Sequence, residues 1–407
     1  MTAKRVRANG EGSIFPYRSG FAAYAWVTKP DGRRQRKYVY GKTREEVHEK
    51  WVDLLKQARS GPVATKTPTV AEFMTYWLRE VVEPNLAPLT ASTYETLVRL
   101  YIVPGLGSKN LARLQTRDVQ EWINRVRRTC QCCAQGKDAR RPEGKRRCCA
   151  VGRCCGQVLS ARTVRDLKTV LRSALGQAVR EELVSRNAAA QVKLTKTRSR
   201  KGKAWSSDEA RAFLESARDD QDPLYAAYVL VLVLGLRKGE VLGLTWDQVD
   251  LEAAELTVSR QLQRVRRELL HRETKTEASE ATLPLPPICV TALRSRLAQE
   301  EQDRARAGEA WRGLGFVVSS RYGSPIDPRN FNRAWDARVA AAGVRRITVH
   351  DARRTCATLL ADLDVHPRVA MQILRHADSA VTMEIYTKAT SKATREALRR
   401  LSESLDG

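Results

Sequence analysis

The alternation of hydrophobic and polar positions in the first sixty residues predicts a small sheet followed by one helix. Three short runs have the pattern of strands: residues 13–17, 21–29 and 33–40. Pro30-Asp31-Gly32 predicts the turn between the last two strands. Thr43 and Glu46 have the spacing of a capping box, so we expect a helix to start there.

Helical spacing dominates between residue 70 and about residue 192. Thr69 and Glu72 form a second capping-box pattern at its start. Apolar positions then recur at helical intervals in three further stretches: 90–102, 117–128 and 161–183. The pattern predicts a small helical bundle, which a cysteine-rich insert interrupts at residues 130–155.

The rest of the chain is predicted to be mainly helical, and Ser206 with Glu209 marks its first helix. Residues 224–236 form an apolar run of about one dozen residues, too short to span a bilayer, which predicts a buried helix. Strands with a hairpin are expected near 254–285, and a short strand near 315–319. The predicted fold is therefore mainly α with small β elements, in three domains: 1–62, 68–193 and 204–407.

The charge balance indicates a polyanionic partner. The chain has 72 basic and 46 acidic residues, a net charge of +26. Nucleic acid is the first candidate, and an anionic membrane surface is the alternative. The N-terminal residues lack the apolar segment of a signal peptide, so we expect a cytoplasmic protein, with no membrane partner and with reduced thiols.

Two segments carry this charge in a form that suits DNA. The third predicted strand, RRQRKYVY, combines four basic residues with two tyrosines, and such a strand suits a sheet laid against DNA. Its alternative is a solvated edge strand whose charges discourage aggregation. The connector 192–204 has six basic residues and no acidic one, which favours contact with phosphates over a passive linker.

Chemistry-bearing residues gather in the third domain. His350 and Arg353 are three apart at the start of a predicted helix and share one face. Arg237 and Arg353 could hold a phosphate through planar, paired donors. A phosphodiester attacked by an oxygen gains negative charge, which fixed cations stabilise.

Tyr386 is a candidate nucleophile for such an attack. Its ordinary pKa of ~10 leaves the phenolate about 4 kcal/mol out of reach at neutral pH. A nearby histidine and two guanidinium groups could offset that deficit. The leaving deoxyribose oxygen needs a proton, which Lys275 could supply.

The order Arg, Lys, His-x-x-Arg, His, Tyr resembles the tyrosine recombinases, the integrase family of phages and integrative plasmids. GLRKGEVLGLTWDQVDL resembles the first arginine box of that family, HDARRTCATLL its second box and LRHADSAVTMEIY its tyrosine box. The resemblance extends over all three domains. It implies an arm-type DNA-binding domain at 1–62, a core-binding domain at 68–193 and a catalytic domain at 204–407.

The resemblance also implies a role for each residue in the reaction. Tyr386 would attack the scissile phosphate and form a 3′-phosphotyrosyl link, so that the enzyme integrates and excises a mobile element. His350 would accept a proton, and Lys275 would protonate the leaving 5′ oxygen. Because the phosphotyrosyl ester conserves the bond energy, no cofactor is expected for the chemistry.

Arg237, Arg353 and His376 would hold the phosphate in the same family, and Glu240 would orient the first box. The sequence departs from the family at Arg354, where histidine is frequent, and at Arg375, where glycine is usual. The implied partners are double-stranded DNA attachment sites, three further copies of the chain in a homotetramer on synapsed DNA, and an excisionase or DNA-bending protein.

The insert carries seven of the nine cysteines within 26 residues. Cys130 and Cys133 have the spacing of metal ligands, and two of the cysteines at 148, 149, 154 and 155 could complete a tetrahedral thiolate site. The working set for a structural zinc is Cys130, Cys133, Cys149 and Cys154; the alternative is a loop whose thiols bind nothing. The insert has seven basic and two acidic residues, which fits a DNA-facing loop.

Two other functions compete with the recombinase. A swivelase similar to the type IB topoisomerases would use the same tyrosine chemistry without synapsis. A non-catalytic DNA-binding regulator would have no use for Tyr386. The final residues add a hypothesis of assembly, because Leu398, Leu401 and Leu405 form an apolar stripe that the family docks on a neighbouring subunit.

Overall fold

The computed structural model describes residues 14–28, 32–60, 68–195, 202–274 and 281–375. The chain divides into two compact units, residues 1–197 and 198–407. The predicted turn at Pro30-Asp31, Lys275, His376, Tyr386 and the apolar stripe near the C-terminus lie outside the described residues.

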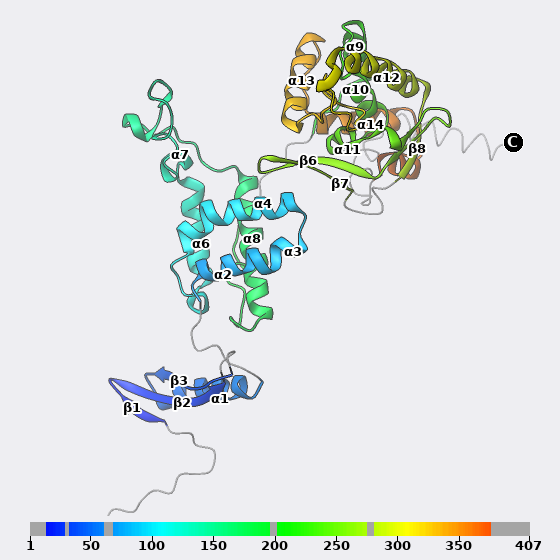
Figure 1. The fold of residues 1–407 in the computed structure, drawn as a ribbon. Coiled ribbons are helices and arrows are strands. Elements are labelled where there is room, and N and C mark those ends of the chain that lie inside the picture. Colours follow the sequence, from blue (N-terminus) through cyan, green and yellow to red (C-terminus); the bar gives the residue numbers. More distant parts are fainter. Residues whose placement is uncertain (1–13, 29–31, 61–67, 196–201, 275–280, 376–407) are drawn as a thin grey trace, which may run out of the picture. The chain divides into compact units, whose positions relative to one another are not determined.

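The N-terminal part is an antiparallel sheet with one helix on its inner face (Figure 1). Its strands are β1 (Phe15–Tyr17), β2 (Gly20–Thr28) and β3 (Arg34–Gly41), followed by α1 (Arg44–Ser60). Ala25, Val27 and Leu54 form the small core between sheet and helix. Thr43 Oγ1 accepts from Glu46 N at 3.2 Å, as the capping box predicts, while the Glu46 carboxylate accepts from Lys42 N at 2.8 Å.

Helices follow in the second part of the first unit: α2 (Val70–Trp77), α3 (Glu83–Asn85), α4 (Pro88–Leu97), α5 (Val103–Leu106), α6 (Thr116–Arg128), α7 (Gln131–Ala134) and α8 (Ala161–Arg180). Two π-helical segments, Leu78–Val82 and Val98–Ile102, extend α2 and α4. The predicted capping box of Thr69 and Glu72 starts α2. Trp77 and Trp122 are fully buried in one core with Leu171 on α8, so the predicted bundle is confirmed.

The second unit surrounds one apolar helix, α10 (Tyr225–Val233), which lies within the predicted buried run. Its other helices are α9 (Ser207–Asp219), α11 (Lys238–Gly243), α12 (Pro287–Ala307), α13 (Pro328–Ala341), α14 (Val349–Asp362) and α15 (Pro367–Leu374). Ser206 and Glu209 cap α9 as predicted. Trp205 stacks on Trp335 in the core, and Phe213 packs against both rings at a tilt. Within the described ranges, no helix is long and apolar enough to cross a bilayer.

Among its described residues, the β elements of this unit form two small antiparallel sheets. One contains β4 (Val249–Asp250), β5 (Glu255–Val258) and β8 (Ala281–Pro284), and the other is the hairpin of β6 (Arg260–Val265) and β7 (Glu268–Glu273). The prediction of a mainly helical fold with small sheets is confirmed. The predicted strand at 315–319 is wrong: Phe316 and Ser319 form only isolated bridges. Phe316 bridges to Thr245, but a 3₁₀ helix begins at the next residue, Trp246. The two segments therefore do not continue into a ladder of β-sheet hydrogen bonds.

Candidate active site and cysteine module

The turn between α10 and α11 sets the position of Arg237. Gly235 adopts φ +60°, and a Cβ there would lie 2.5 Å from Leu374 Cδ2, so both the turn and the close approach require glycine. Arg237 is then the N-cap residue of α11. Its backbone N donates to Glu240 Oε2 at 2.8 Å and its Nη1 donates to Oε1 at 2.6 Å. The first box is therefore held by a carboxylate that is itself buried.

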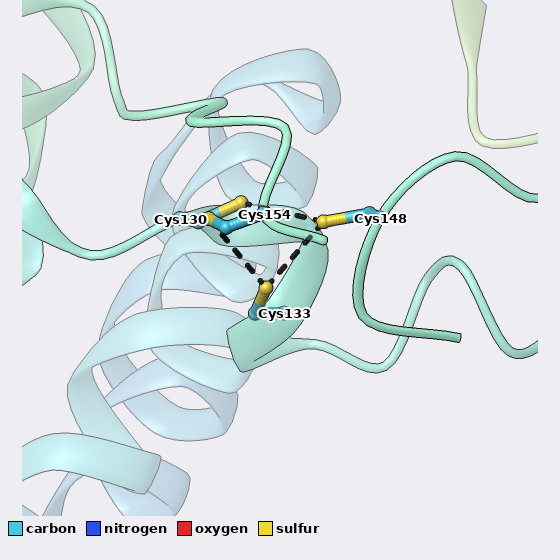
Figure 2. A group of neighbouring side chains, drawn as sticks. All are labelled: Cys130, Cys133, Cys148 and Cys154. Atoms are coloured by element: carbon cyan, nitrogen blue, oxygen red, sulfur yellow. Dashed lines mark hydrogen bonds between the residues drawn. The ribbon is translucent and has the colours of Figure 1, made fainter. Parts of the chain in front are cut away.

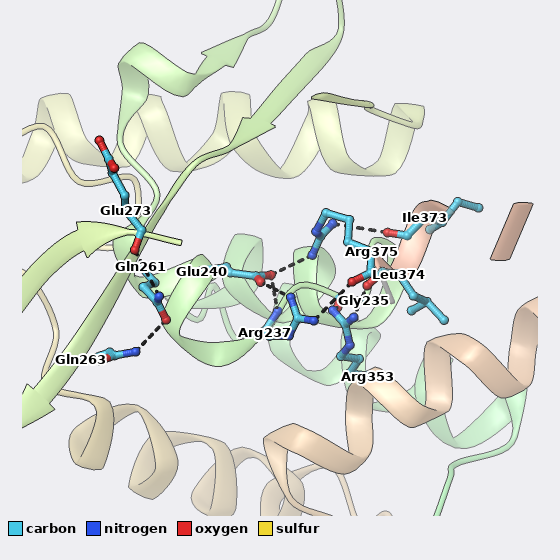
Figure 3. A network of polar contacts seen from close by, with 10 residues as sticks. All are labelled: Gly235, Arg237, Glu240, Gln261, Gln263, Glu273, Arg353, Ile373, Leu374 and Arg375. Carbon is cyan, nitrogen blue, oxygen red and sulfur yellow. Dashed lines mark hydrogen bonds and ion pairs between the residues drawn. The ribbon is translucent and has the colours of Figure 1, made fainter. Parts of the chain in front are cut away.

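The second box lies on α14, which Thr348 and Asp351 begin with a capping box. His350 is exposed on the first turn, whereas Arg353 is buried. Arg353 donates to the carbonyl oxygens of Gly235 and Leu374, which joins α14 to the turn after α10 and to the end of α15 (Figure 3). Burial and the nearby charge of Arg237 lower the pKa of Arg353 to about 9, which leaves it protonated at neutral pH.

Three of the six predicted catalytic residues line one cavity of about 540 Å³: Arg237, His350 and Arg353. Lys238 is on the same wall and donates to Asn332 Oδ1 at 3.2 Å. Residues 237 and 353 are more than a hundred positions apart in the sequence, so the fold alone brings them together. Lys275, His376 and Tyr386 lie outside the described residues.

Arg375 is a residue of this site that sequence reasoning did not assign. It ends α15 in the left-handed conformation (φ 51°, ψ 50°), which favours glycine, the residue usual at this position. Its side chain is buried and Nη2 donates to Glu240 Oε2 at 2.7 Å (Figure 3). Burial lowers the pKa of Arg375, and the Glu240 carboxylate opposes that effect. In the sequence, the only indication of this role was an arginine at a position where the family usually has glycine.

The charges of this cluster do not cancel. Arg237 and Arg375 both form ion pairs with the Glu240 carboxylate. Arg353 lies close to them but donates its hydrogen bonds to backbone carbonyl oxygens. Three guanidinium groups therefore meet one carboxylate, and the cavity keeps a surplus of positive charge. A site of this kind is complementary to an anion such as a phosphodiester.

The cysteine insert forms a compact thiol cluster between α6 and α8. Cys130, Cys133, Cys148 and Cys154 have sulfur atoms that all lie within 4.8 Å of one another, and Figure 2 shows these four side chains gathered at one point. The Sγ–Sγ distances are 3.4 Å for Cys133–Cys148 and 3.9 Å for both Cys130–Cys148 and Cys133–Cys154. Three of the four residues of the working set are thus present in the cluster.

Cys149 is the exception, and Cys148 takes its place. Asp138 explains the choice, because its fully buried carboxylate accepts from the backbone N of Cys148 at 2.7 Å and of Ala150 at 3.1 Å. These bonds turn the Cys148 side chain inward and leave Cys149 exposed. Burial raises the pKa of Asp138, but hydrogen bonds from the amides of Arg147 and Cys148 and from Arg141 lower it to about 2. Outside the insert, Cys289 and Cys356 are buried.

The outer face of the N-terminal sheet is aromatic and basic. Tyr38 and Tyr40 on β3 are 42% and 51% exposed, and Trp26 on β2 is 49% exposed. The Arg36 guanidinium lies 4.9 Å from the ring centroids of both Tyr24 and Trp26. Since α1 packs on the opposite face, this surface is built from the alternate positions of two strands.

Two family models match the chain. The Phage integrase family model matches residues 203–393, and the model of the phage integrase N-terminal SAM-like domain matches residues 69–126. Together they cover well over half of the chain. The chain belongs to the phage integrase family, the tyrosine-type recombinases that rearrange DNA by strand transfer. The predicted family and enzyme class are confirmed.

Individual relatives align with this chain over most of its length. The chain is 25% identical to the tyrosine recombinase XerC-like protein of Caldanaerobacter subterraneus subsp. tengcongensis, over 92% of this chain and 93% of that protein. It is 28% identical to an integrase of Streptomyces ambofaciens, over 88% and 86% of the two chains. The fold resembles the Tn1549 transposon integrase solved with circular-intermediate DNA, with a TM-score of 0.62 at 21% identity, over 82% and 99%.

Proposed function

We propose that this recombinase integrates and excises a mobile genetic element, such as a phage or integrative plasmid, at specific DNA attachment sites. The main support for this proposal is the cavity lined by Arg237, His350 and Arg353, in which positive charge exceeds negative charge. Similar proteins support a mobile element as the substrate: one is an integrase of Streptomyces ambofaciens and another is the integrase of the transposon Tn1549.

The reaction starts with the phenolic oxygen of Tyr386, which attacks the scissile phosphorus. A bond forms between that oxygen and phosphorus, and the bond from phosphorus to the 5′ oxygen breaks. His350 accepts the phenolic proton, and Lys275 gives a proton to the leaving 5′ oxygen. A 5′ hydroxyl of the partner strand then attacks the 3′-phosphotyrosyl link and releases Tyr386. The number of phosphoester bonds is unchanged, so no nucleotide or metal is required.

Charge in the transition state is stabilised by Arg237, Arg353 and His376. The two guanidinium groups are held by the Glu240 carboxylate and by backbone oxygens, so they need little reorganisation when the phosphate gains charge. The same charges favour the phenolate of Tyr386, which is about 4 kcal/mol out of reach for a free phenol at neutral pH.

The N-terminal region, residues 1–62, is proposed to bind arm-type DNA sites through the outer face of its sheet. Exposed Tyr38, Tyr40 and Trp26 lie there with Arg36, and aromatic and guanidinium groups together suit contacts to sugar and phosphate. The region through residue 60 has fourteen basic and six acidic residues, so its binding should weaken steeply with salt. Residues 68–193 would bind the core site, and 204–407 would catalyse.

The thiol cluster is proposed to hold one structural zinc through Cys130, Cys133, Cys148 and Cys154. In a tetrahedral site with Zn–S bonds of ~2.3 Å the sulfur atoms lie about 3.8 Å apart. The three separations given above, 3.4 to 3.9 Å, fit that edge length, and every pair of these sulfur atoms lies within 4.8 Å. Four thiolates close the coordination shell, so the metal would stabilise the fold of the insert and take no part in strand transfer.

Assembly is proposed as a homotetramer on two synapsed DNA duplexes, in the cytoplasm at the nucleoid. The segment after Ala393 would dock its apolar stripe on a neighbouring subunit, and an excisionase or DNA-bending protein would set the direction of recombination. A chain cut after Ala393 should bind single sites and fail in synapsis.

A supercoiled plasmid that carries two copies of the attachment site tests the proposed function. Recombinant products are expected with purified protein and no added nucleotide. Relaxation without recombinants would indicate a swivelase, and neither product, with DNA binding intact, would indicate a regulator. Either of those outcomes contradicts the proposal.

A further inference from the structure

A basic cavity of about 490 Å³ lies between the helical bundle and the cysteine module, far from the catalytic residues in sequence. Arg99 contributes from the π-helical segment, Arg125 from α6, and Lys137 and Arg140 from the module. No carboxylate lines it. Within the described parts of the chain, the nearby carboxylates of Glu121 and Asp138 pair with Arg117 and Arg141 rather than with any of these four cations. Such a concave cluster of uncompensated cations attracts an anion.

Trp122 adds an unsatisfied donor to the wall of this cavity. The residue is 1% exposed, and its Nε1 has no hydrogen-bond partner among the described residues. A Cβ at Gly105 would lie 2.1 Å from Nε1, so glycine is required for the backbone to pass over the indole. A buried donor without a partner is unusual in a folded protein. Its N–H dipole strengthens the positive potential that the four cations create.

Half of the cationic lining belongs to the module that contains the thiol cluster. Lys137 and Arg140 lie within seven positions after Cys133, and Lys137 N donates to Cys132 O at 3.0 Å. The neighbouring Asp138 binds the amide of Cys148, a residue of the cluster. The same short segment therefore carries both a thiol of the cluster and two cations of the cavity. Loss of the cluster would release Lys137 and Arg140 while leaving Arg99 and Arg125 on the bundle.

We propose that this cavity binds a backbone phosphate of the DNA substrate, and that metal binding by the thiol cluster sets the affinity of the cavity. The inference rests on the proposed function, since it takes DNA as the substrate and a metal in the cluster. It adds a new contact: a phosphate held by cations of the bundle and the module together. Guanidinium groups bind phosphate with paired donors, and neutralising a phosphate releases a counterion.

The first test measures binding of the full-length protein to a fluorescent duplex that carries the attachment core, over a range of salt concentrations. Arg125→Gln is expected to weaken binding roughly tenfold, and to lower the slope of log affinity against log salt by about 1. Arg128→Gln is the matched control, because Arg128 is on the same helix, is also exposed and does not line the cavity. Equal affinities and equal slopes for the two variants would overturn the inference.

The second test asks whether metal and cavity act together. Cys133→Ser should weaken binding, and Arg140→Gln should weaken it further only when the cluster is intact. The two effects should therefore be non-additive in a double-mutant cycle. Cys149→Ser is the control, because Cys149 is exposed and outside the cluster. Full additivity of Cys133→Ser and Arg140→Gln would contradict the link between metal and cavity.

The two tests also separate this inference from the proposed function. If recombination and zinc binding are normal while Arg125→Gln binds DNA like Arg128→Gln, only the phosphate site fails. If the purified protein holds no metal, the zinc part of the proposed function fails, and with it the link to the cluster. Titration with thymidine 5′-monophosphate identifies the source of the phosphate: tight nucleotide binding that Arg125→Gln abolishes, with DNA affinity unchanged, would overturn the assignment to DNA.

Discussion

The candidate active site and the cysteine module each contain one buried carboxylate that binds several groups, but the two are assembled in opposite ways. Glu240 binds Arg237 and Arg375, and the more distant partner, Arg375, is 135 positions away in the sequence. Asp138 gathers the amides of Cys148 and Ala150, only 10 and 12 positions away. The first site depends on the fold of the whole second unit, residues 198–407, whereas the second depends on a short local segment and its thiols. Changes in one should leave the other intact.

Removal of a buried arginine should give the largest effect on activity and none on the module. Arg353→Lys keeps one charge but cannot reach both Gly235 O and Leu374 O with a planar fork. We expect strand transfer to fall roughly a hundredfold or more, the size seen when one preorganised donor to a transition state is lost. Single-turnover cleavage measures this. Arg346→Lys is the control, since Arg346 lines the same cavity but is an exposed partner of Asp336. Equal rates for both variants would refute the role of Arg353.

Disruption of the thiol cluster should change the cysteine module and leave the fold of the second unit intact. Cys133→Ser is expected to reduce bound zinc from about one per chain to none, and to speed hydrogen exchange at the amides of Cys148 and Ala150. The second unit should keep its melting temperature. Metal analysis and exchange mass spectrometry check this, with Cys149→Ser retaining the metal. If the wild-type protein contains no zinc after purification under reducing conditions, the zinc proposal is contradicted and the insert is a loop whose thiols bind no metal.

Substitution of Arg375 should have the smallest effect of these three changes, because Arg375 acts on the site only through Glu240. Arg375→Gly relieves the left-handed backbone but removes the bond to Glu240, whereas Arg375→Ala removes the bond and keeps the strain. We expect strand transfer to fall about tenfold in both, equivalent to ~1.4 kcal/mol, with the glycine variant the more stable. A glycine variant that cleaves at the full rate would show that the side chain has no part in positioning Arg237.

The sequence predicted what is local and missed what is tertiary. The capping boxes at Thr69 and Ser206 need only four residues, and both are present. Cys148 and Cys149 are adjacent and chemically identical, so only the bonds to Asp138 decide which one turns inward. The predicted strand at 315–319 failed because its partner segment is too short to form a ladder.

The arginine boxes could be predicted because their spacing resembles a known family, yet the pairing of Arg375 with Glu240 could not. A charged residue in a position that favours glycine looks unfavourable until its distant partner is known. The same holds for the cavity beside Trp122, which combines three separate segments of the chain.

The central claim is that Tyr386 is the nucleophile served by the Arg237–Arg353 cavity. A nicked suicide substrate, on which the leaving strand diffuses away, traps the covalent intermediate. The wild-type protein should form an adduct that resists denaturation, and Tyr386→Phe, which loses only the attacking oxygen, should bind the DNA equally well and form none. An adduct formed by the phenylalanine variant would contradict the account.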